Sequence, residues 1–326
     1  MVASPFVSPH LQGGGRVILG EGPLVLGSQL FSTDARRCLL RRTALTSGLT
    51  EDIDLAILLR KEGLIEESAT PILGCVAPMA GGGLLAAIAS GIYLFDLDTR
   101  RIRHFTHPEE DRQHLGPHYN DGKVGPDGCF YVGGMIGGMH GAGRLWRVAP
   151  DGSFTLPHVD NPPLTTPNGM HWFPTADPDV WDFYYVCSQY PAIQRYEHRL
   201  SEGVMSRKPD LVSLPFEEFG YLDGMTGSGN GLLFLCLYLP REYGAIVVDR
   251  ESGEIVERIS TDAPQTTSAA IAGSELYITS AAQGYTEEDF ERHPNAGSIY
   301  RCLLRDSTVT KVREARGTAP FEFKPL

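Results

Sequence analysis

The sequence predicts an all-β fold: a single six-bladed β-propeller domain over residues 1–326, with four-stranded blades. Three observations lead to this prediction. The 37 Gly and 23 Pro are spread evenly along the chain with no visible linker, which is typical of many short strands and turns in one domain. An alternating strand that runs into a turn recurs about every 50 residues, the usual length of a propeller blade. Residues 1–20 precede the first repeat and offer a strand that closes the ring.

The recurring element reads as a β-hairpin in each repeat. Its clearest copies are IYLFDLDTRRIRHF, RLWRVAPDGSFTL, QRYEHRLSEGVM, AIVVDRESGEIVERI and SIYRCLLRDSTVTKV. Equivalent points in these copies lie 53, 50, 51 and 53 residues apart, and one more step of 53 backwards reaches a sixth copy in RRCLLRR. The equivalent residues are Leu40, Tyr93, Trp146, Tyr196, Val247 and Tyr300. Six repeats of this length favour a propeller over a sandwich.

The strand that closes the ring is predicted in GRVIL, residues 15–19, beside residues 298–324 of the last blade. Such a pairing joins the N-terminal strand to the C-terminal blade and protects the sheet edges. Two segments depart from the repeat. Segment 43–72 is long, and its stretch EDIDLAILLRKEGLIEES fits either an extended hairpin or a short helix. Segment 106–117 is polar, and we expect it to lie over a mouth of the channel.

The amino-acid composition limits the kinds of molecule that the protein is expected to bind. A net charge of -12 and a pI near 5.3 argue against nucleic acid, because binding to phosphates needs Lys and Arg. A small-molecule substrate is expected instead. The stretch MVASPFVSPHLQGGG has neither the basic nor the apolar region of a secretion signal, and the most apolar run, GLLFLCLYLP, is too short to span a membrane. The six cysteines have no CxxC spacing, so we expect buried free thiols. The prediction is a cytoplasmic protein, either a monomer or a weak homo-oligomer.

A second series of residues marks where the innermost strand of each blade begins. Its steps are 54, 45, 48, 55 and 45 residues, and its members are Glu21, Cys75, Asn120, Asn168, Asp223 and Ser268. Equivalent positions in a propeller face the same end of the channel, so these six side chains are expected to form a ring. Oxygen ligands suit Ca, Mg or Mn, and ligand type alone leaves Zn and iron open. We call these six positions the channel ring.

Glycine follows Glu21, Asn168 and Asp223, which lets the backbone turn sharply while the preceding side chain points into the channel. Asn-Gly and Asp-Gly are also common hairpin turns. The out-of-phase stretches Pro126-Asp127-Gly128 and Pro150-Asp151-Gly152 are therefore interpreted as turns. For the in-phase residues, the placement favours metal binding over a mere turn. Cys75 is in phase too, but burial in packing is the favoured interpretation for a cysteine there.

The stretches LGEGPLV, YNDGKVGPDGCFYVGGM, PNGMHW, YLDGM, LYITSA and NAGSIYR follow one another in this order. Together they resemble the regucalcin and gluconolactonase (senescence-marker-protein) family over nearly the whole chain. The resemblance implies a six-bladed propeller, one divalent cation in the channel and hydrolysis of sugar-type lactones. It also implies that Glu21, Asn168 and Asp223 are the metal ligands and that Asn120 contacts the substrate or a metal-bound water.

The chain departs from the family at two places. The family often has Arg two residues before the Asn of its NDGK motif, where this chain has His118. The usual GTM is GGM here and continues as IGGMHGAG, so Met135, Met139 and His140 are expected to shape a more apolar pocket. Both departures raise the alternative of a substrate less polar than a sugar lactone.

For a lactonase, the cation polarises the lactone carbonyl, and Asp223 is the candidate to take the proton of the attacking water. Asn120, His118 and Met135 are the candidate substrate contacts. Lys123 either reaches the pocket or forms a salt bridge between blades. A structural or solvated role is favoured for His140 and His171.

Three hypotheses follow for the function. The first is a metal-dependent hydrolase of a lactone or related cyclic ester. The second keeps the scaffold and the metal for a non-hydrolytic cyclase, isomerase or cycloaddition catalyst acting on an apolar natural product. The third is a non-enzymatic calcium-binding module. The sequence contains no GxSxG, HExxH or GxxxxGK[ST] motif, which argues against a serine hydrolase, a zinc protease and a nucleotide-binding loop.

Overall fold

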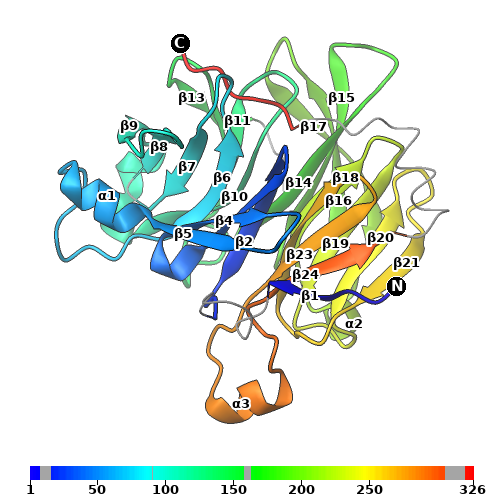
Figure 1. Cartoon of the computed structure of the whole chain (residues 1–326). Coiled ribbons are helices and arrows are strands. Elements are labelled where there is room, and N and C mark those ends of the chain that lie inside the picture. Colours follow the sequence, from blue (N-terminus) through cyan, green and yellow to red (C-terminus); the bar gives the residue numbers. More distant parts are fainter. Residues whose placement is uncertain (8–15, 90, 158–162, 305–319) are drawn as a thin grey trace.

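The computed structural model describes residues 1–7, 16–89, 91–157, 163–304 and 320–326. Six four-stranded antiparallel sheets surround a central channel (Figure 1). The first strand of every blade contacts the first strand of the next, and β22 of the last blade contacts β2 of the first. The six-bladed propeller predicted from the repeat is therefore confirmed.

The strands follow chain order in blades 1 to 5. Blade 1 contains β2 (Gly20–Leu26), β3 (Gln29–Asp34), β4 (Leu39–Ala44) and β5 (Thr50–Asp54). Blade 2 contains β6 (Leu73–Pro78), β7 (Leu84–Ile88), β8 (Gly91–Phe95) and β9 (Ile102–Thr106). Blade 3 contains β10 (Pro117–Val124), β11 (Phe130–Ile136), β12 (Arg144–Val148) and β13 (Phe154–Thr155). Blade 4 contains β14 (Pro167–Pro174), β15 (Val180–Cys187), β16 (Ala192–Arg199) and β17 (Val204–Ser213). Blade 5 contains β18 (Tyr221–Ser228), β19 (Leu232–Tyr238), β20 (Gly244–Asp249) and β21 (Ile255–Ser260).

Blade 6 combines both ends of the chain. It contains β22 (Thr266–Ala272), β23 (Glu275–Ser280), β24 (Ile299–Leu303) and β1 (Ser4–Val7), which pairs antiparallel with β24. The closing strand is therefore not GRVIL, and that prediction was wrong. Within residues 16–19, only Leu19 pairs, through an isolated bridge to Ala281. Residues 305–319, expected beside this strand, lie outside the described residues.

The repeat reflects packing between blades. The six equivalent residues, from Leu40 to Tyr300, all lie on the third strand of a blade with 7% of their surface or less exposed. Among the described residues, six apolar clusters form, one between each pair of neighbouring blades. Because strand side chains alternate between two faces, and neighbours cover both faces of a blade, a central strand such as β7 carries buried apolar residues on both sides. All six cysteines are buried thiols, as expected.

Short helices and turns occupy the connections between strands. They are η1 (Ala35–Arg37), α1 (Leu55–Lys61), η2 (Glu110–Leu115), α2 (Phe216–Phe219) and α3 (Glu287–Arg292). Segment 43–72 contains both predicted alternatives in succession, since strand β5 runs into helix α1. The Asp54 side chain accepts a hydrogen bond from the Ile57 N–H at 2.9 Å and caps this helix, while Leu55 and Leu59 bury its inner face. No helix in the described ranges is long and apolar enough to cross a bilayer.

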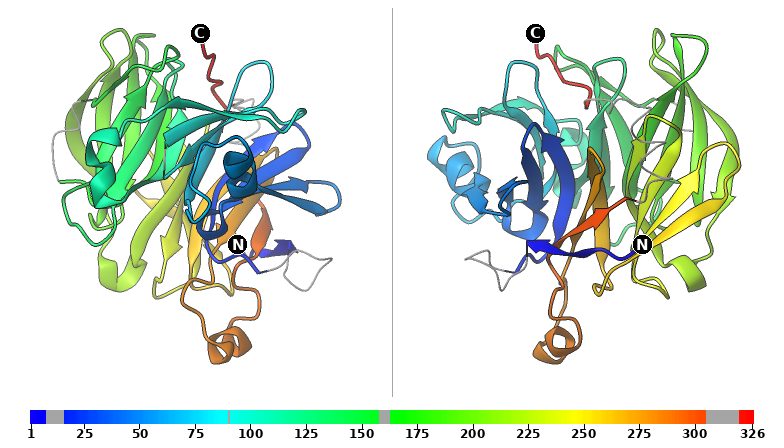
Figure 2. Two further views of the ribbon diagram at one scale, coloured as in Figure 1. Left: turned by 90° about the vertical axis from the view of Figure 1, so that its left-hand side faces the viewer. Right: turned by 45° about the vertical axis from the view of Figure 1, so that its right-hand side comes forward.

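The two ends of the channel carry different connections. Helix α3 protrudes from one end, and the C-terminal residues 320–326 lie at the opposite end (Figures 1 and 2). The Phe323 N–H donates to the Pro78 carbonyl at 3.0 Å, and the Leu326 N–H donates to the Pro150 carbonyl at 3.0 Å. The C-terminal segment is thereby fixed to blades 2 and 3.

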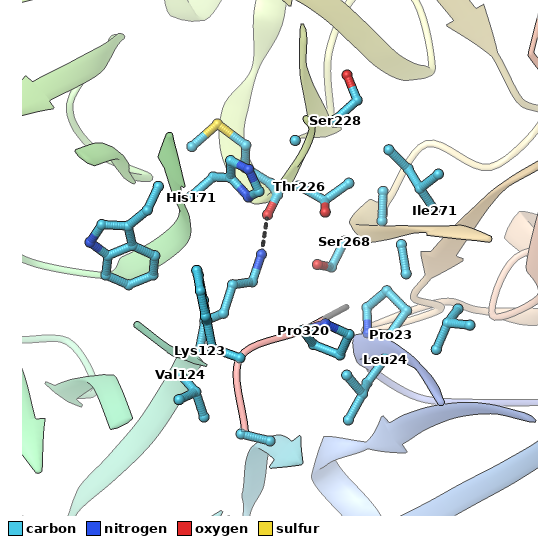
Figure 3. Close-up of a pocket in the computed structure, with 18 of the residues that line it drawn as sticks. Pro23, Leu24, Lys123, Val124, His171, Thr226, Ser228, Ser268, Ile271 and Pro320 are labelled. Carbon is cyan, nitrogen blue, oxygen red and sulfur yellow. Dashed lines mark hydrogen bonds between the residues drawn. The ribbon is translucent and has the colours of Figure 1, made fainter. Parts of the chain in front are cut away.

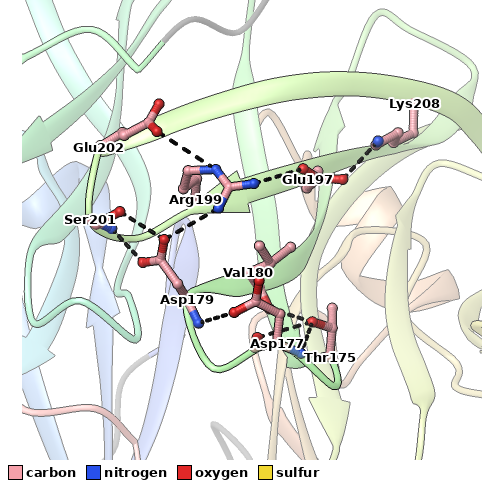
Figure 4. A network of polar contacts seen from close by, with 9 residues as sticks. All are labelled: Thr175, Asp177, Asp179, Val180, Glu197, Arg199, Ser201, Glu202 and Lys208. Carbon is pink, nitrogen blue, oxygen red and sulfur yellow. Dashed lines mark hydrogen bonds and ion pairs between the residues drawn. The ribbon is translucent and has the colours of Figure 1, made fainter.

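Charged side chains lie mainly on the outer strands. On blade 4, Arg199 pairs with Asp179 at 3.4 Å, Glu202 at 3.7 Å and Glu197 at 3.9 Å (Figure 4). About two fifths of the Arg199 side chain is exposed, so solvent screens these pairs and each contributes little to stability. This network lies on the solvent-exposed rim of the blade.

Candidate metal centre in the channel

The channel ring coincides with an irregularity in every innermost strand. Pairing between the first and second strand shifts register in all six blades, at or next to the six ring positions. In β14 the shift lies between Pro167 and Met170, and in β18 it lies between Leu222 and Met225. A β-bulge re-aims the side chain that it contains. The ring residues therefore leave the regular alternation of their strands together.

The glycines beside the ring let neighbouring blades approach closely. A Cβ added to Gly169 would lie 2.3 Å from the Met225 backbone nitrogen, and one added to Gly224 would lie 2.1 Å from the Ser268 hydroxyl oxygen. Gly22 has φ of +53°, a conformation that favours glycine. Close approach is thus confirmed for Gly169 and Gly224, and the turn conformation is confirmed for Gly22.

The three predicted ligands are buried, with exposed fractions of 8% for Glu21, 4% for Asn168 and 7% for Asp223. The Asn168 side-chain N–H donates to the Ser188 hydroxyl at 3.1 Å. Within the described residues, the Oδ1 atoms of Asn168 and Asp223 have no hydrogen-bond partner. Buried oxygens are nearly always satisfied in native proteins, so two oxygen atoms on neighbouring blades without a partner indicate a place for a positively charged ligand.

The electrostatics also favour a cation. Burial raises the pKa of Glu21 well above its ordinary value, and the charges of Asp223 and Asp121 raise it further. Burial likewise raises the pKa of Asp223, with a further increase from Asp121, while a hydrogen bond from Asn168 opposes the rise. Three carboxylates are thus concentrated in a buried space with Lys123 as the nearby positive charge. Carboxylates in such a place need compensating charge.

The side chains therefore fit a hard divalent cation, because all the available atoms are carboxylate or carboxamide oxygens. Glu21, Asn168 and Asp223 would hold it. No group of three or more His, Cys, Asp and Glu suited to a metal occurs in the described part of the chain, and the set proposed here contains one Asn. Sequence reasoning missed Asp121, although it directly follows Asn120 in the NDGK stretch.

The predicted substrate contacts are distributed over both ends of the channel. His118 and Met135 lie directly opposite each other on β10 and β11. Asn120 donates its side-chain N–H to the Pro167 carbonyl of the next blade at 2.8 Å. Lys123 and His171, by contrast, line a cavity on the other side of the channel ring. A substrate role for Asn120, His118, Met135 or Lys123 stays a prediction.

Two polar residues near the channel ring were missed by sequence reasoning. Burial lowers the pKa of His118, and the positive charge of Arg36 lowers it further, which places Arg36 near His118. The Arg36 Nε donates to the Gln283 side chain at 3.2 Å. Burial raises the pKa of Tyr238, as do the charges of Asp223 and Glu21. Both residues come from blades far from His118 in sequence, so no spacing rule would have found them.

The remaining candidates have structural surroundings. Cys75 is 1% exposed, and burial raises the pKa of its thiol well above the ordinary value, which fits packing. Met139 is 45% exposed, and His140 is exposed on the same loop. Met139 therefore does not line an enclosed pocket, contrary to expectation, whereas His140 borders a second hollow together with Thr165 and Gln189.

The fold and the site together define the class of protein. It is a six-bladed propeller with oxygen-bearing side chains that converge on its channel. The particular family follows from comparison, because the model of the SMP-30/gluconolactonase/LRE-like region matches residues 19–282. The chain belongs to this family.

Similar proteins span much of the chain. Regucalcin of Xenopus laevis is 28% identical over 239 residues, covering 70% of this chain and 76% of that protein. A putative sugar lactone lactonase of Bacillus subtilis is 25% identical over 305 residues, covering 89% and 92%. The calcium-binding protein regucalcin of Agrobacterium tumefaciens has the same fold, with a TM-score of 0.77 at 20% identity over 94% of both chains. A luciferin-regenerating enzyme superposes with a TM-score of 0.75 at 20% identity, covering 95% and 96%.

Proposed function

We propose that this protein is a divalent-metal-dependent hydrolase that opens a lactone or a related cyclic ester. The observation that carries the proposal is the pair of buried oxygens without a partner, Asn168 Oδ1 and Asp223 Oδ1, beside the buried Glu21. Family membership supports hydrolysis, since a relative covering 89% of the chain is named a sugar lactone lactonase. The relatives do not favour the non-hydrolytic alternative.

Glu21, Asn168 and Asp223 would hold the cation, which supplies Lewis-acid polarisation of the lactone carbonyl when bound. The three residues come from different blades, so their positions are fixed by the whole ring rather than by one flexible loop. Calcium, magnesium, manganese and zinc are the candidate ions. Oxygen-only donors favour the first three over zinc.

In this proposal Asp223 also accepts the proton of the attacking water, through a carboxylate oxygen that the cation leaves free. Asn120 and His118 orient the substrate. The lowered pKa of His118 keeps the imidazole neutral near pH 7, so it acts as a hydrogen-bonding group. Arg36 and Tyr238 add polar contacts at this end of the channel, which supports a substrate with hydroxyl or carbonyl oxygens.

The decisive experiment measures proton release from a panel of lactones, from sugar γ- and δ-lactones to apolar ones. The cation is first removed with a chelator and then restored one ion at a time. We expect turnover that disappears on chelation and returns with one ion. Absence of turnover across the panel, with cation binding demonstrated by calorimetry, would reject lactone hydrolysis; turnover that survives complete chelation would reject the metal's part.

We propose that the substrate is a small molecule. We also propose that the protein works in the cytoplasm, as a monomer or a weak homo-oligomer. Cysteines kept as buried thiols support a reducing compartment. Sedimentation velocity over a hundredfold range of concentration tests the oligomeric state, since a strong oligomer would keep one high sedimentation coefficient throughout.

A further inference from the structure

A cavity of about 640 Å³ begins at the channel ring, where Ser268 lines it, and extends to Pro320 and Phe321 of the C-terminal segment (Figure 3). The later residues of the six innermost strands form its walls, together with Pro320 and Phe321 of the C-terminal segment. The volume is typical of a site for a small molecule. None of the predicted metal ligands lines it. We call it the far cavity.

Most of the lining is apolar. It includes Leu24, Val25, Val76, Val124, Trp172, Phe173, Trp181, Met225 and Ile271. Phe321 packs edge-to-face on Trp181, with ring centroids 5.6 Å apart, so the C-terminal segment forms part of the enclosure. An enclosed apolar surface of this kind favours a ligand whose body is apolar.

One strong hydrogen-bond donor points into this apolar space. The Lys123 Nζ donates to the Met225 carbonyl at 3.2 Å (Figure 3), and no other hydrogen bond of this group is present in the described structure. An ammonium group has three donors and no acceptor. Two donors of Lys123 therefore remain for a ligand.

The charge of Lys123 already has a counterpart. Asp121 also lines the far cavity, and its carboxylate and the Lys123 ammonium attract each other. The third titratable group of the lining is His171, whose pKa is held well below its ordinary value by burial and by the charges of Lys123 and Arg250. The lining therefore pairs one carboxylate with one ammonium, and burial disfavours a positive charge on its third titratable group, His171. An anionic ligand would bring an uncompensated charge into this space, whereas a neutral acceptor such as a carbonyl oxygen would not.

We propose that the far cavity is a second ligand-binding site, separate from the candidate metal centre, for a neutral and largely apolar small molecule that carries a carbonyl oxygen. Lys123 donates to that oxygen, and the apolar walls enclose the rest of the molecule. The site does not depend on the proposed hydrolysis, because none of its contacts uses the metal ligands.

The probe for the test is the neutral ketone 6-propionyl-2-(dimethylamino)naphthalene, whose emission shifts to the blue in apolar surroundings. The control probe is 2-(dimethylamino)naphthalene, which lacks the carbonyl. We expect the ketone to bind with one-to-one stoichiometry, at least about tenfold more tightly than the control, because a hydrogen bond from a charged donor is strong. Quenching of the emission of Trp172 and Trp181 would accompany binding.

Two substitutions locate the site. Ile271→Trp fills the far cavity from β22, and the matched control Val256→Trp places the same side chain on a half-exposed position of β21 outside the lining. We expect at least tenfold weaker binding of the ketone to Ile271→Trp and unchanged binding to Val256→Trp. Lys123→Met should remove the preference for the ketone, whereas Lys61→Met, at an exposed lysine of α1, should retain it. Circular dichroism and thermal melting check the folding of each variant.

Three results would overturn the proposal: no binding of the ketone up to its solubility limit, equal binding of the two probes to the unaltered protein, or equal binding of the ketone to the two tryptophan variants. The comparison of probes needs no variant, so the proposal remains testable even if Lys123→Met does not fold. Addition of a chelator should leave binding unchanged. Binding that responds to chelation but not to Ile271→Trp would place the ketone at the metal centre and also overturn the proposal.

Discussion

The two sides of the channel ring are built from the same six strands, yet their chemistry is opposite. At the ring itself, bulges turn Glu21, Asn168 and Asp223 together, and two of their oxygens have no partner. Past the ring the strands regain regular pairing, and the lining becomes apolar around Lys123. A local break in strand register, rather than a different fold, therefore creates the polar site. We therefore expect a substitution on one side of the channel ring to leave the other side intact.

The largest expected difference comes from Asp223→Asn. Removing one carboxylate from the candidate metal centre should lower lactone turnover by roughly 10³-fold or more, because a metal contributes several kcal/mol to transition-state stabilisation. Binding of the ketone probe to the far cavity should not change. The matched control is Ser268→Ala, a ring position not proposed as a ligand. Comparable loss of turnover in both variants would mean that the ring acts only as a scaffold.

The dependence of cation binding on pH should also separate the two sides. The pKa values of Glu21 and Asp223 are raised, so in the metal-free folded protein these carboxyls keep their protons at pH values where ordinary carboxyls have lost them. Their contribution to the stability of the metal-free protein therefore falls as the pH rises from the ordinary pKa to the raised pKa. A cation must displace those protons. Its affinity should therefore increase with pH, by up to about tenfold per unit for each proton released.

Calorimetry of cation binding in two buffers of different ionisation enthalpy measures this proton release. Ketone binding to the far cavity serves as the internal control and should be the same at pH 6 and pH 8. Cation binding without proton uptake by the buffer would contradict the assignment of Glu21 and Asp223 as ligands.

A third, smaller effect tests the close approach of blades at the ring. The added Cβ of Gly169→Ala meets the Met225 backbone at 2.3 Å, so we expect a loss of about 1–3 kcal/mol in the free energy of unfolding. Gly137→Ala is the matched control, because nothing lies within 4 Å of its Cβ. Urea unfolding with equal m-values compares the two. Equal stability of the variants would show that the blades can separate at the ring without cost.

The smallest expected effect concerns Arg36→Met. Because the charge of Arg36 lowers the pKa of His118, its removal should raise that pKa toward 6.5, measurable by NMR titration. The KM for polar lactones should rise several-fold with little change for apolar ones. Arg37→Met, in the same turn η1, is the control, since Arg37 pairs with Asp34 instead. An unchanged pKa of His118 would show that the charge of Arg36 does not act on this imidazole.

The sequence was sufficient for the fold and for the ring, but only in part for the site. The period of about 50 residues exists because each blade buries the same third-strand residue against its neighbour, as Tyr93 and Tyr196 illustrate. Residues in phase can be aligned without coordinates. Arg36 and His118 come close only because blades 1 and 3 face one channel, and Asp121 is out of phase with the ring. The spacing of residues along the chain therefore cannot predict that these side chains lie close together.

Two other predictions failed for local reasons. GRVIL alternates like a strand, yet the pairing partner of β24 is the earlier segment Ser4–Val7, because several short apolar stretches compete for one open edge and their pattern does not rank them. Met139 lies in the expected loop, but its side chain is 45% exposed. Side-chain direction in such a loop is decided by backbone dihedral angles that the sequence pattern does not determine.

The pairing of β1 with β24 joins residues that are almost three hundred positions apart, such as Ser4 and Arg301. During synthesis on the ribosome, β1 is made first and its partner is made nearly last. Blades 1 to 5 each consist of consecutive strands, so they can form as the chain emerges, whereas blade 6 must wait. Closing so long a loop is entropically costly and slow relative to local hairpins. The seam between β1 and β24 is therefore expected to be the last part of the molecule to fold and, under mechanical or thermal stress, the first to open.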